Sequence, residues 1–132
     1  MIAVLDVSAA IEILLKKGKK ELFDASFQGA DWVLAPDLFV PEITNVLWKY
    51  HKAKVIDHEE CVQLVGDGIE MIDDFIDSKE LWKEALSEGI KNGHSIYDMY
   101  YLISARRNDA TLLTNDGSLA KLSSKMKIDF VN

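Results

Sequence analysis

Four acidic residues occupy positions where a carboxylate could take part in chemistry: Asp6, Glu42, Asp98 and Asp116. Asp6 directly follows the apolar run IAVL, and Asp116 follows the apolar run TLLT after one residue. Both runs have the composition of buried parallel strands, and open α/β sheets bind ligands beyond the carboxyl ends of their strands. The two aspartates are therefore candidates for one site at that edge of a sheet.

Each of these acids also has a simpler explanation when it is considered alone. Asp6 and Asp116 could cap the helices that follow them, since aspartate is a favoured N-cap residue. Glu42 could be a first-turn acid that the helix dipole stabilises. Asp98 stands three residues after Ser95, a spacing typical of a capping box. The residues themselves leave both explanations open.

Considered together, the four carboxylates predict a cation site. Clustered carboxylates repel one another, and a hard divalent cation compensates that repulsion. Mg²⁺ and Mn²⁺ prefer oxygen ligands, keep several waters, and need only a few carboxylates plus the phosphate oxygens of a substrate. Such an ion can activate a water and stabilise charge on a phosphoryl group. Whether the four acids meet depends on the fold.

Strands and helices that alternate along the chain are expected to position the acids. The apolar, β-branched runs predict strands over 2–7, 32–36, 71–76, 111–114 and 128–131. Helical spacing and capping signals predict helices over 8–17, 20–27, 36–55, 58–69, 79–92, 96–108 and 119–126. This alternation predicts an α/β fold with helices packed on a mainly parallel sheet of four to five strands.

The composition is typical of one folded domain over residues 1–132, since this length is near the modal domain size. With 48% hydrophobic residues, the chain can bury a core. Its single cysteine, Cys61, excludes an internal disulfide and fits a reducing compartment. Neither a signal-peptide pattern nor an apolar run of transmembrane length occurs. We therefore expect a cytoplasmic protein without a membrane partner.

The net charge of −7 argues against a basic coat for non-specific nucleic-acid binding. Residues 57–88 hold eleven acids against two lysines, so the charge is uneven. Basic residues gather elsewhere in the chain. The candidates for a local contact with RNA are Lys16, Lys17, Arg106 and Arg107.

The chain resembles PIN domains, and among them the compact VapC-type ribonucleases of toxin–antitoxin pairs. Four segments carry the resemblance: VLDVSAAIEILL at 4–15, PEITNVLWK at 41–49, SIYDMYYLISARRNDATLLTND at 95–116, and IDFV at 128–131. Each segment is short and degenerate. The ordered combination of Asp, Glu, Asp and then T-x-D is fairly specific, and it spans almost the whole chain.

The resemblance implies a three-layer α/β/α sandwich and cleavage of single-stranded RNA with Mg²⁺ or Mn²⁺. By similarity, the metal-binding and catalytic acids are Asp6, Glu42, Asp98 and Asp116. The same similarity gives supporting roles to Ser8, Asn45 and Thr114.

The resemblance also implies partners, namely a homodimer and a VapB-like antitoxin whose segment lies across the active-site groove. The sequence departs from the family pattern at two places. Asn115 stands where the family often has a small or apolar residue. Met99, Tyr100 and Tyr101 replace packing that is often rich in alanine, which could alter the groove or the dimer face.

Three other functions compete with a toxin ribonuclease. A phosphatase of the haloacid dehalogenase type also places an aspartate after its first strand, but it needs D-x-D, and Ser8 occupies the second position here. A PIN-like binding module without catalysis and a PIN nuclease with a housekeeping role remain open. His58 and Cys61 are three residues apart on an expected helix, and we interpret them as surface and core residues rather than metal ligands.

Overall fold

The computed structural model describes residues 1–132. It contains one sheet, which is parallel throughout. Its strands are β1 (Ile2–Leu5), β2 (Trp32–Pro36), β3 (Asp74–Ile76), β4 (Thr111–Leu113) and β5 (Phe130–Val131). They are ordered β3-β2-β1-β4-β5, and each neighbouring pair is parallel. The carboxyl ends of all five strands therefore lie at one edge of the sheet.

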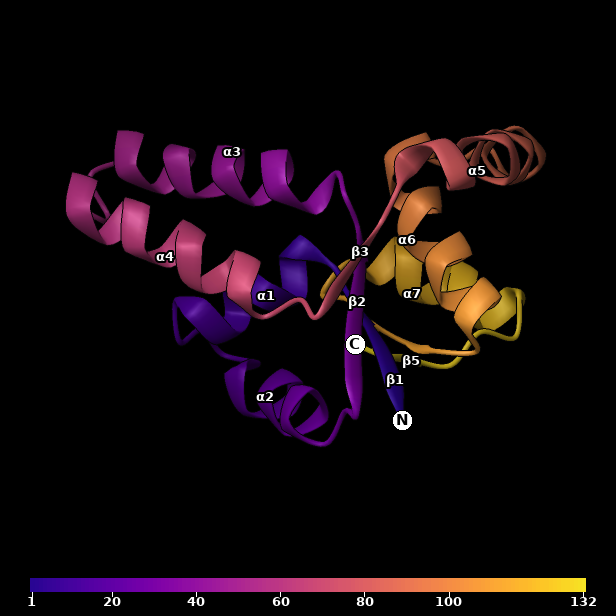
Figure 1. Ribbon diagram of the computed structural model, residues 1–132, viewed down its shortest axis with the longest axis horizontal. Coiled ribbons are helices and arrows are strands. Elements are labelled where there is room, and N and C mark those ends of the chain that lie inside the picture. The colour runs from indigo at the N-terminus through magenta and orange to yellow at the C-terminus, as the bar shows by residue number, and fades with distance from the viewer.

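Helices cover both faces of this sheet (Figure 1). On one side lie α1 (Val7–Leu14), α2 (Lys20–Gln28), α3 (Phe39–Lys52) and α4 (His58–Glu70). On the other side lie α5 (Ser78–Asn92), α6 (Ile96–Asn108) and α7 (Gly117–Lys125). The predicted α/β class and the three-layer arrangement are confirmed. No helix is both long enough and apolar enough to cross a membrane.

Several strands are shorter than the sequence predicted. β1 ends at Leu5 because the next residue, Asp6, already caps α1. β3 covers three residues of the expected 71–76. β5 covers two residues of the expected 128–131, because Lys127 takes a left-handed conformation (φ 58°) and Ile128 N–H bonds back to the end of α7. Residues that begin or follow a helix thus occupy positions for which the apolar composition alone predicted a strand.

Local signals define the helix ends well. The capping box between Asp57 and Glu60 forms at the start of α4. Asp77 accepts a hydrogen bond from the backbone of Lys79 and caps α5, and Gly93 ends that helix with φ 61°. Glycine is suited to this left-handed position because it lacks a Cβ. These caps agree with the helix ranges that capping signals predicted for 58–69 and 79–92.

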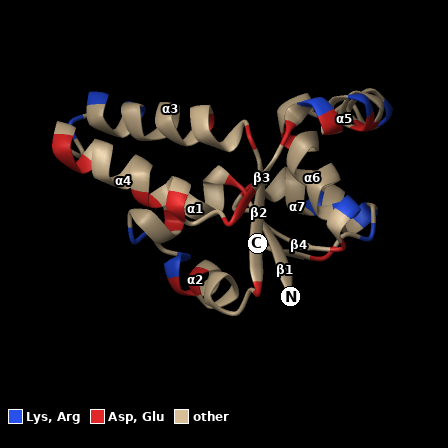
Figure 2. Ribbon diagram, viewed as in Figure 1, with Lys and Arg blue, Asp and Glu red and all other residues tan.

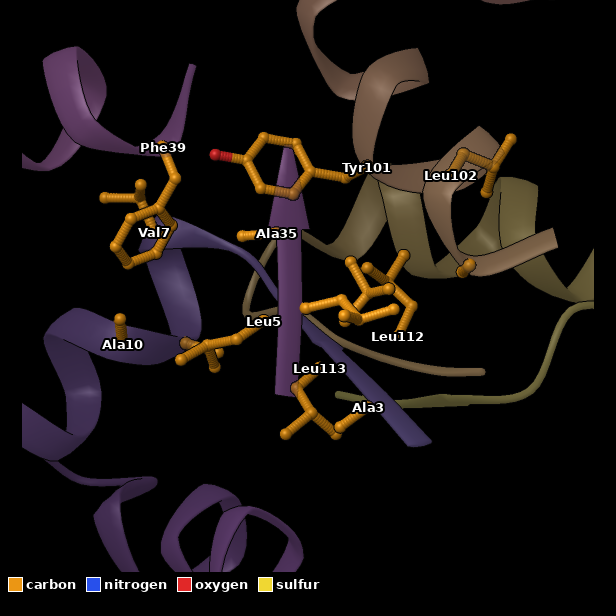
Figure 3. Close-up of a cluster of buried hydrophobic side chains, with 14 of the residues drawn as sticks. Ala3, Leu5, Val7, Ala10, Ala35, Phe39, Tyr101, Leu102, Leu112 and Leu113 are labelled. Carbon is orange, nitrogen blue, oxygen red and sulfur yellow. The ribbon is translucent and has the colours of Figure 1, made fainter. Parts of the chain in front are cut away.

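The core forms on both faces of the sheet, around its central strand β1 and the neighbouring strand β4. Leu5 lies toward Ala10 on α1, whereas Leu112 lies toward Leu102 on α6 (Figure 3). All four side chains are fully buried. Burying one leucine stabilises a fold by about 1.5–3 kcal/mol, so this packing fixes where the strands end and where the following residues point.

Candidate active site

A cavity of about 380 Å³ brings the four predicted acids together. Its lining includes Asp6 after β1, Glu42 in the first turn of α3, Asp98 in the first turn of α6, and Asp116 after β4. The cavity thus lies at the carboxyl edge of the sheet, as the sequence predicted. In Figure 2, acidic segments lie at the centre of the molecule beside the sheet as well as on outer parts of α2, α4 and α5, whereas lysine and arginine colour mainly the outer ends of helices.

Asp6 is both a helix cap and a member of this site. Its Oδ1 accepts hydrogen bonds from Ala9 N–H at 3.0 Å and from the Ser8 hydroxyl at 2.6 Å, and its Oδ2 accepts one from the Thr114 hydroxyl at 2.5 Å. A carboxylate has about four acceptor positions, so one position, on Oδ2, is left free. Burial raises the pKa of Asp6 from 3.8 to about 6; these hydrogen bonds oppose that shift, and the charge of Asp98 adds to it.

Two hydroxyl groups join Asp6 to the segment that follows β4. The backbone N–H of Asn115 donates to Ser8 Oγ at 2.8 Å, and that of Asp116 donates to Thr114 Oγ1 at 3.0 Å. Each hydroxyl accepts from this backbone and donates to Asp6. The arrangement gives a physical reason for the supporting roles expected of Ser8 and Thr114, because together they fix the two aspartates relative to each other.

Tyr101 holds Glu42 from the opposite side of the cavity. The tyrosine ring is 3% exposed and lies over the carboxyl end of β2 with its hydroxyl toward α3 (Figure 3). That hydroxyl donates to Glu42 Oε1 at 2.7 Å. Burial raises the pKa of Glu42, the bond from Tyr101 opposes the rise, and the charges of Asp6 and Asp98 add to it. Burial raises the pKa of Tyr101 most, and the neighbouring Glu42 raises it further. This phenol therefore stays protonated and remains a hydrogen-bond donor.

Asp98 does not form the capping box that its spacing allowed. Ser95 makes no side-chain hydrogen bond at the start of α6. Instead, Asp98 Oδ2 lies 3.6 Å from His94 Nδ1. Burial raises the pKa of Asp98, Asp116 adds to the rise, and His94 opposes it. The carboxylate is therefore free of a capping role and faces the cavity.

Asp116 caps α7 as well as lining the cavity. Its Oδ1 accepts from the backbone N–H groups of Ser118 at 2.9 Å and Leu119 at 3.2 Å, and from the Ser118 hydroxyl at 2.8 Å. Burial acts to raise the pKa of Asp116, but these hydrogen bonds outweigh it and the pKa is lowered. Of the four acids, Asp116 is thus the one that most readily carries its charge.

The donor set suits a hard divalent cation. All four side chains offer only oxygen, and burial and mutual repulsion raise the pKa of three of them, Asp6, Glu42 and Asp98. No three histidine, cysteine, aspartate or glutamate side chains converge closely enough to hold an ion by themselves. Mg²⁺ fits such an open set because it binds one or two carboxylates and keeps several waters.

The other predicted residues are distributed unevenly around this cavity. Lys17 lines it. Asn45 is exposed, one turn after Glu42, and does not line it. Lys16 lines a separate hollow between α1 and α4. The structure therefore brings one of these residues to the acids, and the RNA contact predicted for Lys16 stays a prediction.

Arg106 and Arg107 lie at the far end of α6 from Asp98. Arg106 binds Glu84 and Glu88 on α5, each at 3.1 Å, and Arg107 binds Glu84 at 2.6 Å. Eight residues of α-helix separate Arg106 from Asp98, a distance of about 12 Å along the axis. The arginines thus join two helices, and neither lines the cavity.

Three residues near the acids are not identified by the sequence patterns. The sequence marks Tyr101 only as a departure from the family, and no sequence pattern points to His94. Glu12 also lines the cavity and is 7% exposed. Its signal is present in the sequence, because a charged residue within the buried run AAIEILL requires a polar surrounding. Tyr101 and His94 give no comparable local signal.

Comparisons with known proteins agree with this architecture. The PIN domain family model matches residues 3–125. Ribonuclease VapC3 of Pyrobaculum aerophilum is 26% identical over 120 residues, which cover 89% of this chain and 92% of that protein.

Solved structures share the fold. PAE2754 of Pyrobaculum aerophilum superposes with a TM-score of 0.75 at 18% identity, covering 98% of this chain and 83% of that one. VapBC2 of Rickettsia felis, bound to a DNA fragment from its promoter, gives a TM-score of 0.67 at 16% identity, covering 100% and 98%. VapC20 of Mycobacterium tuberculosis, a toxin that cleaves the sarcin-ricin loop, gives 0.67 at 11%, covering 91% and 94%. With an all-parallel sheet, acids at its carboxyl edge and a family match over nearly its whole length, the chain belongs to the PIN domain family.

Proposed function

We propose that this protein is an endoribonuclease that uses Mg²⁺ or Mn²⁺ to cleave single-stranded regions of RNA. The observation that carries the proposal is the cavity at the sheet edge, which Asp6, Glu42, Asp98 and Asp116 line together and where burial raises the pKa of three of them. Membership of the PIN family and the ribonuclease named among its relatives support the same chemistry.

The four acids would hold the cation, directly or through water. When bound, such an ion lowers the pKa of a coordinated water and offsets negative charge on the phosphate under attack. Asp6 offers the free lone pair on Oδ2, because its other acceptor positions are engaged by Ala9, Ser8 and Thr114. Tyr101 keeps Glu42 in place through its hydroxyl.

The size of the cavity supports a single strand as substrate. About 380 Å³ falls within the usual range for small ligand pockets and suits a nucleotide-sized group. In a duplex the bases are paired and stacked, so a nucleotide would have to leave the stack before its base could enter the cavity. Bases of a single strand are already free to enter such a site.

A substitution of Asp98 tests the reaction. Asp98→Asn removes one carboxylate, and we expect the rate of RNA cleavage to fall by about 100-fold or more, because cation stabilisation of the transition state is worth several kcal/mol. The assay compares a single-stranded RNA oligonucleotide with its duplex in Mg²⁺, in Mn²⁺ and in EDTA. Asp109→Asn is the matched control, since Asp109 lies at the opposite end of α6 in a left-handed conformation that asparagine also adopts.

The result that contradicts the nuclease function is equally specific. If Asp98→Asn cleaves as fast as the wild type, the activity comes from a contaminant. If the wild-type protein binds RNA but cleaves none in either metal, a PIN-like binding module is the correct description.

We further propose that the protein acts in the cytoplasm as a homodimer and as the toxin of a VapBC-type pair. VapBC2 of Rickettsia felis, which shares the fold of this chain, supports a VapB-like antitoxin as its partner. A small reading frame directly upstream, whose product co-purifies with this chain and stops RNA cleavage, is the expected result. Absence of such a partner would favour a housekeeping nuclease.

A further inference from the structure

One part of the cavity takes no part in the proposed cleavage. Besides the four acids, the cavity is lined by four polar residues that have no role in cleavage: Glu12, Lys17, Tyr50 and Asn115. Glu12 stands six residues beyond Asp6, and Tyr50 stands eight residues beyond Glu42. At 1.5 Å per residue, Glu12 lies about 9 Å along α1 from Asp6, and Tyr50 lies about 12 Å along α3 from Glu42, whereas Asn115 directly precedes Asp116. These distances suit a group next to the phosphate that is cleaved.

Glu12 is a buried carboxylate with an unused oxygen. Its side chain is 7% exposed, and its Oε1 accepts a hydrogen bond from Asn115 Nδ2 at 3.2 Å. Its Oε2 is buried and has no hydrogen-bond partner. Leaving a buried acceptor unpaired is unfavourable, so a ligand that supplies an N–H group would relieve the cost. The terminal torsion of glutamate is soft, so either oxygen can turn toward a ligand.

The neighbours of Glu12 suit a flat aromatic ligand rather than a second cation. Tyr50 offers a half-buried ring, and Ile11 and Val46 line the same cavity with apolar surface. Lys17 Nζ donates to the Tyr50 hydroxyl at 2.8 Å and lies 5.4 Å from the centre of its ring. An ammonium that lines the same cavity repels a metal ion from this part of it but attracts a phosphate. Acceptor, aromatic surface and positive charge together match a nucleotide.

We propose that Glu12, oriented by Asn115, recognises the amino group of the RNA base next to the cleaved phosphate and thereby discriminates against uracil. This inference rests on the proposed ribonuclease function and names the substrate feature that the same site selects.

The chemistry of the bases explains the direction of the preference. Guanine presents N1–H and an N2 amino group side by side, so both carboxylate oxygens can accept. Adenine and cytosine each present one amino group. Uracil has a single N3–H between two carbonyl oxygens, and these oxygens would face the carboxylate. Guanine should therefore be preferred most and uracil least.

Cleavage of a randomised single-stranded RNA pool, mapped by sequencing the product ends, tests the proposal. For wild-type protein we expect uracil to be depleted at one position beside the cut by at least about fivefold relative to guanine, the lower limit for a good bidentate contact. Glu12→Gln should lose most of this depletion, because an amide also donates to the uracil carbonyl groups. Glu21→Gln, which makes the same change at an exposed position of α2, should retain it.

Titration of the folded protein with guanosine or uridine 5′-monophosphate, followed by NMR, separates this inference from the nuclease function. If wild type and Glu12→Gln cleave with the same base frequencies at every position, base selection by Glu12 is wrong while the nuclease function stands. If no RNA is cleaved, the nuclease function fails and the titration decides alone. Tighter binding of the guanosine nucleotide that disappears in Glu12→Gln supports the inference, and equal binding of both nucleotides overturns it.

Discussion

Replacing Asp6 by asparagine measures the free energy that the buried carboxylate costs when no cation is bound. Burial raises the pKa of Asp6 from 3.8 to about 6. One pKa unit corresponds to about 1.4 kcal/mol, so ionising Asp6 is about 3 kcal/mol less favourable in the folded protein than in the unfolded chain. Asparagine keeps the size and shape of the side chain and removes the ionisation.

The sign of the effect follows from proton binding. Between pH 3.8 and about 6, the folded state holds more protons at Asp6 than the unfolded state does. The free energy of unfolding therefore falls as the pH rises through this window, and the loss is complete above it. Asp6→Asn lacks this contribution, whereas the cost of its altered hydrogen bonds is the same at every pH. Glu42 also loses a repelling neighbour, which acts in the same direction.

Urea unfolding in EDTA at about pH 4.5 and about pH 7.5 gives the comparison. The decrease in unfolding free energy between the two pH values should be about 2 kcal/mol smaller for Asp6→Asn than for wild type. Asp74→Asn, at an exposed position of β3, should follow the wild type. Equal decreases in all three proteins would refute the reasoning, because the carboxylate would then ionise as easily in the fold as outside it.

Two further predictions concern the residues that hold the acids. Tyr101→Phe removes only the hydroxyl that binds Glu42, so Mg²⁺-dependent cleavage should fall by about 10- to 100-fold, measured as cleavage rate against Mg²⁺ concentration. Unchanged metal dependence would mean that Glu42 needs no such support. Thr114→Val removes the donor to Asp6 and the acceptor for Asp116 N–H in a fully buried position, so urea unfolding should show a loss of about 1–3 kcal/mol. A loss below a few tenths of a kcal/mol would show that water replaces the hydroxyl.

The sequence determined the fold class and the order of the acids because both depend on local patterns. Apolar runs such as IAVL and TLLT predict buried parallel strands from their composition, without knowledge of how the chain folds. The capping box of Asp57 and Glu60 likewise lies within one helical turn. The boundaries of β1, β3 and β5 were less predictable, since capping and turn residues competed there with strand propensity.

Asp6 and Asp116 each cap a helix and also line the cavity, so capping does not exclude them from the site that we propose. For Asp98, the alternative of a capping box is wrong. A helix cap can be recognised from about four consecutive residues. Whether the capping side chain also lines a cavity shared with other acids depends on how the strands and helices pack.

Tertiary structure alone decided what supports and surrounds the acids. The bond from Thr114 to Asp6 spans 108 residues of sequence, and that from Tyr101 to Glu42 spans 59. No periodicity or spacing connects residues so far apart, because their approach depends on how β1 and β4 pair and how α6 packs on the sheet. The same packing left Glu12 buried beside Asn115 with one oxygen unpaired.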